Sequence, residues 1–322
     1  MAPSSLTMQL MDVRCFLLAA ELGSVTRAAE ALHRAQSAAS VSIARLESHL
    51  GTQLLERHPG GVRPTAAGEA FVSHAETILN CVERAERELA SFRESSSGAI
   101  RGQVNVGVAP SLTPLLLSRL LRSVHEDAPE LVINPTEALT RDLLDRLATH
   151  ELDLVLLWLP ASLPPELQVQ AVGSTSLAVV AGTDHALADR SEVTLAELED
   201  EDWVAFPGAN PARQWIEGSC LRAGFAPRVS HEIESLTEVK AFVEAGMGIT
   251  LLPAGSVAAE VGSGELVALE VASPAPHAIY GYAHNDSRES AAVAEVRRAV
   301  ETHLSDAGTE AEPVPPSSQL GS

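Results

Sequence analysis

The sequence predicts an α/β protein that begins with a small helical domain and continues through one long helix. Three observations support this prediction. Apolar residues recur at helical spacing in the first 50 residues, and from residue 71 they recur in steps of four and three. From residue 103 onward, strand-like runs alternate with helical patterns, which is typical of α/β domains. A length of 322 residues fits two or three domains.

Three helices are expected before residue 51. The first runs from about Gln9 to Leu22 and is followed by Gly23, the residue type that commonly ends a helix. Residues 26–50 then show a short helical pattern, a break and a longer amphipathic helix. We expect the apolar side of this third helix to pack on the second helix through Ala39, Ile43, Leu46 and Leu50.

The other side of the third helix carries small or hydrogen-bonding side chains, which are Gln36, Ser37, Ser40 and Ala44. A slim polar face of this kind suits a helix that enters a DNA major groove and reaches base edges. The alternative is an ordinary helical hairpin with a solvated outer face. Residues 51–65 favour DNA binding, because two short extended segments flank a Pro-Gly-Gly turn and complete a winged helix-turn-helix.

Linked segments of this region resemble the N-terminal domain of LysR-type transcriptional regulators. They are Gly23–Leu32, Gln36–Ser40, Leu46-Glu47, Leu50-Gly51, Leu54–Arg57 and Pro64–Gly68. The resemblance implies a sequence-specific DNA-binding regulator whose activity is modulated by a small-molecule effector. It also implies DNA contacts from the second helix, the third helix and the wing. The expected DNA-binding residues are Thr26, Arg27, Gln36, Ser37, Ser40, Val41, Arg45, Arg57, Arg63 and Thr65.

A long helix is predicted from Gly68, and a hinge is expected at residues 95–98. Its apolar residues form a heptad seam over about three heptads, a pattern typical of helices that pair with another helix. Packing on the rest of the same chain is the alternative. We favour pairing with a second copy, since two helix-turn-helix units then read two half-sites. The expected dimerisation residues are Phe71, Ala75, Ile78, Val82, Ala85, Leu89 and Phe92.

The α/β region is predicted to form two lobes with a cleft between them, as in the resembled family and in periplasmic binding proteins. A second lobe begins near residue 171, and the last strand and helix return to the first lobe. We expect strands at 103–109, 131–136, 153–158, 176–181, 203–206, 228–233, 248–252 and 277–284, and helices at 113–126, 139–149, 211–223, 236–245 and 288–304.

The predicted domain boundaries follow from these elements. They are a disordered lead (1–8), a winged helix-turn-helix domain (9–67), a dimerisation helix with hinge (68–98), an effector-binding domain (99–307) and a disordered tail (308–322) rich in proline, serine and acidic residues. Within the effector-binding domain, lobe I comprises residues 99–170 and 273–307, and lobe II comprises residues 171–272.

The effector is expected where strands end and helices begin, because ligands in α/β sheets bind at the carboxyl ends of strands. Ser111 is also a candidate helix N-cap. Arg213 and Lys240 are the nearest basic candidates for an effector carboxylate, with solvated helix residues as the alternative. The expected effector-binding residues are Ser111, Thr113, Trp158, Phe206, Pro207, Thr237, Gly246 and Thr250, with Leu159 and Leu236 beside them.

The formal net charge of −21 is unevenly distributed. Residues 1–70 contain six arginines and six acidic residues, so the whole excess belongs to the remainder, which has sixteen basic and thirty-seven acidic residues. DNA is therefore expected to approach only the neutral N-terminal domain, with weak non-specific binding and strong salt sensitivity. No apolar run reaches the roughly 18 residues of a membrane span, and no secretory signal is visible, so a cytoplasmic protein is expected.

Catalysis and cofactors find little support in the sequence. Nucleophile elbows, His-Glu-x-x-His motifs and phosphate-binding loops are missing, and the histidines and cysteines lack metal-ligand spacing. A peroxide-sensing dithiol, which one branch of the resembled family uses, needs two cysteines in the C-terminal half, where only Cys220 is present. We therefore expect no enzyme activity, no cofactor and no metal.

The expected partners are double-stranded promoter DNA, a small-molecule effector, further copies of the chain in a dimer or tetramer, and RNA polymerase as a candidate. Two alternatives belong to other classes of protein. The α/β region alone suggests a solute-binding protein of periplasmic type, which the N-terminal helix-turn-helix disfavours. An α/β enzyme with an accessory DNA-binding domain is disfavoured by the missing catalytic motifs.

Overall fold

The computed structural model describes residues 8–93, 99–159, 167–208, 210–272, 275–285 and 289–303. These residues form two compact units, one built mainly from residues up to 90 and the other mainly from later residues. The predictions for residues 1–7, for the hinge at 95–98 and for the tail lie outside the described residues. Over the described ranges, no helix combines the length and the apolar character that crossing a membrane requires.

The three N-terminal helices are confirmed as α1 (Leu10–Leu22), α2 (Val25–Ala31) and α3 (Gln36–Leu50). Gly23 and Gly51 end α1 and α3 in the left-handed conformation, with φ of 64° and 68°, which glycine adopts without steric cost. The apolar stripes of the helices meet in one core that includes Val13, Phe16, Ala28, Ala39, Ile43 and Leu46.

The predicted wing is a two-stranded antiparallel ribbon of β1 (Leu55–His58) and β2 (Gly61–Pro64). Its turn lies against the end of α1, where the Val62 amide donates a hydrogen bond of 3.0 Å to the Gly23 carbonyl. Gly61 has φ of 135°, and a Cβ atom at this position would lie 2.2 Å from the same carbonyl oxygen. The close approach of wing and helix therefore requires glycine at this position.

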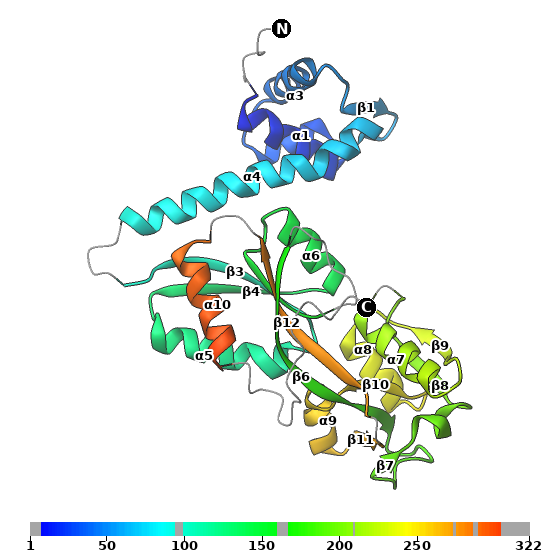
Figure 1. The fold of residues 1–322 in the computed structure, drawn as a ribbon. Coiled ribbons are helices and arrows are strands. Elements are labelled where there is room, and N and C mark those ends of the chain that lie inside the picture. Colours follow the sequence, from blue (N-terminus) through cyan, green and yellow to red (C-terminus); the bar gives the residue numbers. More distant parts are fainter. Residues whose placement is uncertain are drawn as a thin grey trace. The chain divides into compact units, whose positions relative to one another are not determined.

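The long helix α4 (Ala66–Arg93) is confirmed (Figure 1). Its apolar seam, however, is divided between buried and exposed residues. Ala75 is fully buried in the N-terminal core, and the Phe71 ring lies 5.5 Å from the ring of Phe16. Ala75 is therefore enclosed by its own chain and is not available to a second copy, while half-buried Phe71 packs on α1; dimerisation through the rest of the seam stays a prediction. Farther along, Leu89 is 63% exposed, while the side chain of Phe92 lies outside the described part.

The second unit is built on a mixed sheet in the order β4-β3-β5-β12-β6-β11-β7, with β10 also paired to β6. Strands β3, β4 and β5 are parallel, whereas β12 runs antiparallel to both β5 and β6. The bounds are β3 (Gly102–Val108), β4 (Leu131–Glu137), β5 (Leu154–Trp158), β6 (Leu167–Gly182), β7 (Glu192–Val193), β10 (Thr250–Pro253), β11 (Leu266–Val271) and β12 (His277–Asn285).

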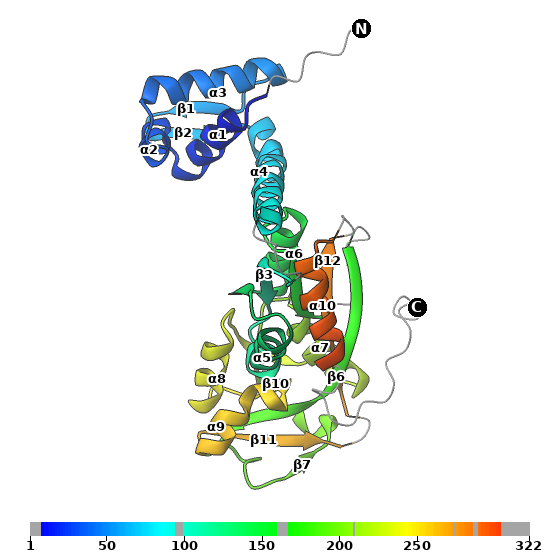
Figure 2. The same ribbon diagram turned by 90° about the vertical axis from the view of Figure 1, so that its left-hand side faces the viewer.

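Strand β6 joins the two lobes, as Figure 2 shows by its length and curvature. Its first half pairs with β12, and its second half pairs with β10 and β11. The sequence predicted only residues 176–181 as a strand and a lobe boundary near 171, whereas the strand is continuous from 167 to 182. Strands β7 and β11 were not predicted.

Helices cover the sheet in both lobes. A π-helical turn (Thr113–Leu117) leads into α5 (Ser118–Asp127), which packs beside α10 (Ala291–His303), and α6 (Thr140–Ala148) completes lobe I. Lobe II adds the parallel pair β8 (Asp202–Ala205) and β9 (Arg228–Glu232) with α7 (Pro211–Arg222), α8 (Leu236–Glu244) and α9 (Ala258–Ser263). Two 3₁₀ turns, Leu195–Leu198 and Ala254–Val257, precede β8 and α9.

Candidate functional site

The candidate DNA-reading surface is the outer face of α3. Ala39, Ser42, Ile43 and Leu46 point into the core, which leaves the first two turns of the other face exposed. Gln36 and Ser40 lie one turn apart on that face, and the Gln36 Nε2 atom donates a hydrogen bond of 3.0 Å to Ser40 Oγ. The two side chains are thereby held together at the N-terminal end of the helix, the end from which recognition helices contact bases.

Val41 gives the same face one apolar contact point. Its side chain is 62% exposed, although burial of valine is normally favourable. An exposed β-branched side chain beside polar neighbours can meet a thymine methyl group, which apolar contacts read. Ala35 provides no side-chain cap to α3, although the Ala38 amide in its first turn donates to the Ala35 carbonyl at 3.0 Å.

The wing and the N-terminal end of α2 border this face. A hollow of about 320 Å³ between α2, α3 and the wing is lined by Ser40 and Ala44 of α3 and by Arg57 of β1, among other residues. The Arg57 guanidinium is exposed and has no ion-pair partner in the described part of the chain. The structure thus places the Ser40 hydroxyl and the Arg57 guanidinium beside the same hollow.

Of the other predicted DNA-binding residues, Thr65 and Arg63 are already engaged within the domain, whereas Thr26 and Arg27 are exposed. The Thr65 hydroxyl donates to the Gln53 carbonyl at 2.7 Å and accepts from the Gly68 amide at 3.1 Å, so it caps the start of α4. Arg63 forms an exposed ion pair of 2.6 Å with Glu56. Thr26 and Arg27 are exposed in the first turn of α2, which Ser24 caps.

Arg45 is held by the core rather than directed freely outward. Its guanidinium donates through Nε and Nη2 to both carboxylate oxygens of Asp12, at 2.6 and 2.5 Å, and Nη2 also donates to Gln9. Burial would raise the pKa of Asp12, but hydrogen bonds from Arg45 and Ser42 and the guanidinium charge outweigh burial, so the pKa lies below its usual value. Arg45 therefore joins α3 to α1.

In the second unit, the predicted effector residues Ser111 and Trp158 meet directly. The Trp158 indole donates a hydrogen bond of 2.7 Å to Ser111 Oγ at the carboxyl ends of β3 and β5. The Trp158 ring also makes edge-to-face contacts with Trp215 of α7, at 5.0 Å, and with Tyr280 of β12, at 5.9 Å. Trp215 thus provides a contact from lobe II to lobe I that the sequence did not identify.

The remaining candidates are dispersed. Thr113 donates to Glu137 at 2.7 Å, and Phe206 is buried in a cluster under α7 and α8, with half-buried Pro207 directly after it. The buried Thr250 hydroxyl has no hydrogen-bond partner among the described residues. Thr237 lies in the first turn of α8, whereas Gly246 lies just after its other end, about 13 Å away at 1.5 Å per residue.

The two basic candidates in lobe II are neutralised by nearby carboxylates. Arg213 forms ion pairs with Glu217, at 2.6 Å, and with Glu232, at 2.8 Å. Lys240 forms an ion pair of 2.8 Å with Glu260. An effector carboxylate would have to displace one of these partners, so the apolar and hydroxyl-bearing residues are the better candidates in this lobe.

The cysteines and acidic residues provide no redox pair or metal site in the described chain. All three cysteines are free, and Cys15 and Cys220 are buried. Burial raises the pKa of the Cys220 thiol to about 12, so the thiolate that reacts with peroxide is scarce at neutral pH. No described group of three His, Cys, Asp or Glu residues could hold a metal ion.

Two family models match the chain. One is described as a bacterial regulatory helix-turn-helix protein of the lysR family and matches residues 10–69. The other is described as a LysR substrate binding domain and matches residues 97–305. The matches leave between them a stretch that contains most of α4.

Curated relatives and solved structures agree with these matches. The chain is 30% identical to the transcriptional dual regulator GltC of Bacillus subtilis, in an alignment that covers 78% of this chain and 82% of GltC. It is 31% identical to the DNA-binding transcriptional dual regulator OxyR of Escherichia coli, in an alignment that covers 85% of this chain and 88% of OxyR. The fold is similar to that of CbnR in complex with its target DNA, with a TM-score of 0.73 at 20% identity, over 91% of this chain and 99% of CbnR. It is also similar to that of full-length OxyR of Pseudomonas aeruginosa, with a TM-score of 0.65 at 24% identity, over 92% of this chain and 98% of OxyR.

Proposed function

The chain belongs to the LysR family of bacterial DNA-binding transcriptional regulators, and from this membership we propose how its own residues read DNA, sense a ligand and pair with a second copy. The predicted boundaries give each task a domain: residues 9–67 read DNA, 68–98 dimerise and 99–307 bind the effector. The protein acts by binding rather than by turnover, and it reaches transcription through RNA polymerase.

DNA sequence is read by the exposed face of α3. Gln36 and Ser40 reach base edges, Val41 contacts a thymine methyl group, and Ser37 and Arg57 contact the phosphate backbone. The single observation that carries this proposal is the 3.0 Å hydrogen bond between Gln36 and Ser40 on an exposed helix face whose opposite side is the domain core. Thr65 and Arg45 support this surface indirectly, because they fix α4 and α1 in place.

Footprinting on the DNA upstream of the chain's own coding region tests this proposal. We expect one extended protected region with an inverted repeat at its centre, and loss of protection in Gln36→Ala and Ser40→Ala. Each lost base contact should cost about 1–3 kcal/mol. Ser73→Ala, which removes an exposed hydroxyl from α4, is the matched control and should leave protection unchanged.

Two results would reject this assignment. Protection that survives in the Gln36→Ala, Ser40→Ala double variant would show that α3 does not read the bases. A lack of protection by the wild-type chain even at low salt, where phosphate contacts are strongest, would show that this DNA is not its target.

The effector binds between the lobes, beside the Ser111–Trp158 hydrogen bond and the Trp158–Trp215 contact. These groups come from both lobes, so a ligand that separates or bridges them shifts the lobes between two arrangements. All three tryptophans of the chain lie in the second unit, and two of them, Trp158 and Trp215, are at the proposed site. A metabolite that binds there should change the intrinsic fluorescence, and Trp158→Phe should abolish most of that change; an unaltered response in this variant would place the ligand elsewhere.

A further inference from the structure

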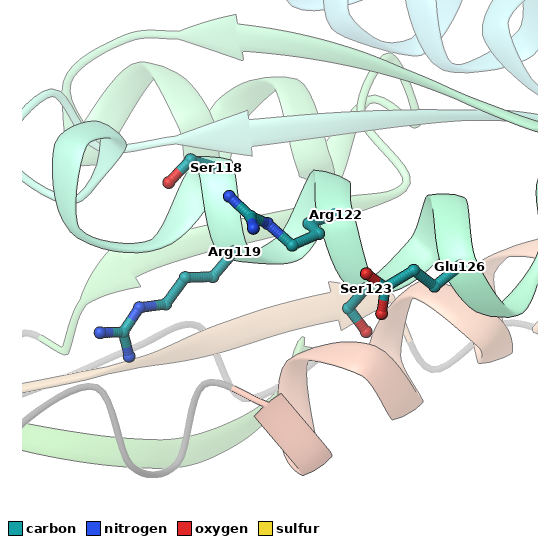
Figure 3. Close-up of a pocket in the computed structure, with 5 residues that line it drawn as sticks. All are labelled: Ser118, Arg119, Arg122, Ser123 and Glu126. Atoms are coloured by element: carbon teal, nitrogen blue, oxygen red, sulfur yellow. The ribbon is translucent and has the colours of Figure 1, made fainter.

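We propose that α5 carries a second binding site, for a small organic anion that also bears a hydroxyl group. A cavity of about 470 Å³ lies along this helix, within the size range of small-molecule sites. Its described lining comes from five side chains, which Figure 3 shows along one stretch of α5: Ser118, Arg119, Arg122, Ser123 and Glu126.

Helical spacing places these five side chains on one surface. Arg119 and Arg122 are three residues apart and are therefore neighbours, and Ser118 lies one turn from Arg122. Leu120 and Val124 point into the core of lobe I. The α5 surface thus combines two guanidiniums and two hydroxyls beside one hollow.

The guanidinium groups of Arg119 and Arg122 form no ion pair with a described carboxylate. Elsewhere in the described second unit, arginine and lysine are mostly held in ion pairs, as the acidic excess favours. The pairs are Arg101–Glu130, Arg146–Asp142, Arg190–Glu197, Arg213–Glu217, Arg228–Asp202, Lys240–Glu260, Arg297–Glu289 and Arg298–Glu295. Arg119 and Arg122 are therefore available to an external carboxylate or phosphate, which guanidinium donors bind with two parallel hydrogen bonds.

Ser123 provides an independent sign of a missing ligand. Only 6% of the residue is exposed, and its hydroxyl oxygen has no hydrogen-bond partner among the described residues. A buried hydroxyl without a partner is costly, and native proteins usually satisfy such groups. Ser123 lines the cavity, and a rotation of its side chain about the Cα–Cβ bond would turn the enclosed hydroxyl toward an acceptor atom of a bound anion.

Glu126 restricts the class of ligand. Its carboxylate lies at the same cavity and has no ion-pair partner in the described chain. A bare anion would be repelled by this carboxylate, whereas an anion with its own hydroxyl donor would bond to it. The geometry therefore favours hydroxy acids and sugar-type phosphate esters over simple carboxylates.

Calorimetric titration of the full-length chain at fixed ionic strength tests this site with malate and glycerol 3-phosphate as probes. We expect at least one of them to bind once per chain and more tightly than succinate, which lacks the hydroxyl. Arg122→Gln should weaken binding about tenfold or more, and Ser123→Ala should weaken it severalfold. Arg141→Gln, which removes an exposed charge from α6, is the matched control and should bind like the wild type.

Several results would overturn the proposal. The first is an absence of binding for both probes at concentrations up to about 10 mM. The second is an equal weakening of binding in Arg141→Gln, which would indicate general charge attraction. The third is a loss of binding in Trp158→Phe but not in Arg122→Gln, which would place the probe between the lobes. A change of oligomeric mass in Arg122→Gln without any effect on probe binding would also overturn it, since a second copy would then be the partner of α5. Because no DNA is present, failure here leaves the DNA-reading proposal untouched.

Discussion

The division of the α4 seam predicts that Phe71→Ala destabilises the N-terminal unit without weakening the dimer. Phe71 packs on Phe16, with the two rings 5.5 Å apart, and Phe16 is fully buried. Truncation of a buried phenylalanine costs about 3–5 kcal/mol, and because Phe71 is only half-buried we expect about 2 kcal/mol, including the lost aromatic contact. For a domain of 60–100 residues this corresponds to a decrease in Tm of about 8–16 °C.

The chain itself allows the two units to be monitored separately. All three tryptophans belong to the second unit, so their fluorescence follows only its unfolding. The circular dichroism signal at helical wavelengths also reports the helices of the N-terminal unit. Phe71→Ala should therefore lower the circular dichroism transition and leave the fluorescence transition unchanged.

Leu89→Ala is the matched variant from the other end of the seam. Leu89 is 63% exposed in one chain, so its truncation should leave both transitions of the isolated chain in place and weaken the dimer measured by analytical ultracentrifugation. If Phe71→Ala instead dissociated the dimer while its circular dichroism transition stayed within about 2 °C of the wild type, the assignment of Phe71 to its own core would be wrong.

Three further predictions use single positions. Hydrogen bonds and the charge of Arg45 hold the pKa of Asp12 below its unfolded value of about 3.9. The Arg45–Asp12 pair therefore stabilises the folded protein above that pH, and this stabilisation is lost as the pH falls through the lower folded pKa. Acid should accordingly lower the unfolding temperature of the N-terminal unit more in the wild type than in Asp12→Asn. Gly61→Ala should destabilise the wing and weaken DNA binding, measured by gel shift, because its Cβ would overlap the carbonyl at the end of α1; a wild-type affinity would contradict this. Cys220, with its pKa raised to about 12 by burial, should resist iodoacetamide in the folded chain while half-buried Cys81 reacts, and labelling of Cys220 in mass spectrometry would show that the core opens.

Local rules were sufficient for most elements of the fold. Glycine at 23 and 51 ends α1 and α3, the Pro-Gly-Gly turn closes the wing, and apolar periodicity identifies each long helix. The features that sequence reasoning missed depend on distant partners. Strand β6 continues through the lobe boundary because β12 pairs with its first half and β11 with its second, and neither partner is adjacent in sequence.

The candidate sites show the same division. The exposed face of α3 was predictable, because helical periodicity alone determines which residues lie opposite the core. The role of Arg45 was not, since its partner Asp12 lies 33 residues away and the pattern of α3 gives no sign of it. Trp215 likewise became a candidate only through its edge-to-face contact with Trp158.

The proposed anion-binding surfaces share one arrangement that follows from the charge of the chain. With a net charge of −21, carboxylates are abundant, and most described arginines of the second unit form ion pairs with them. Arg57 lines a hollow with Ser40 and Glu47, and Arg122 lines a hollow with Ser123 and Glu126, yet neither arginine forms an ion pair with a described carboxylate. Arg141 is exposed as well, but it lines neither hollow. An unpaired guanidinium together with a hydroxyl in a cavity, rather than exposure alone, is therefore the criterion by which we assign anion binding in this acidic protein.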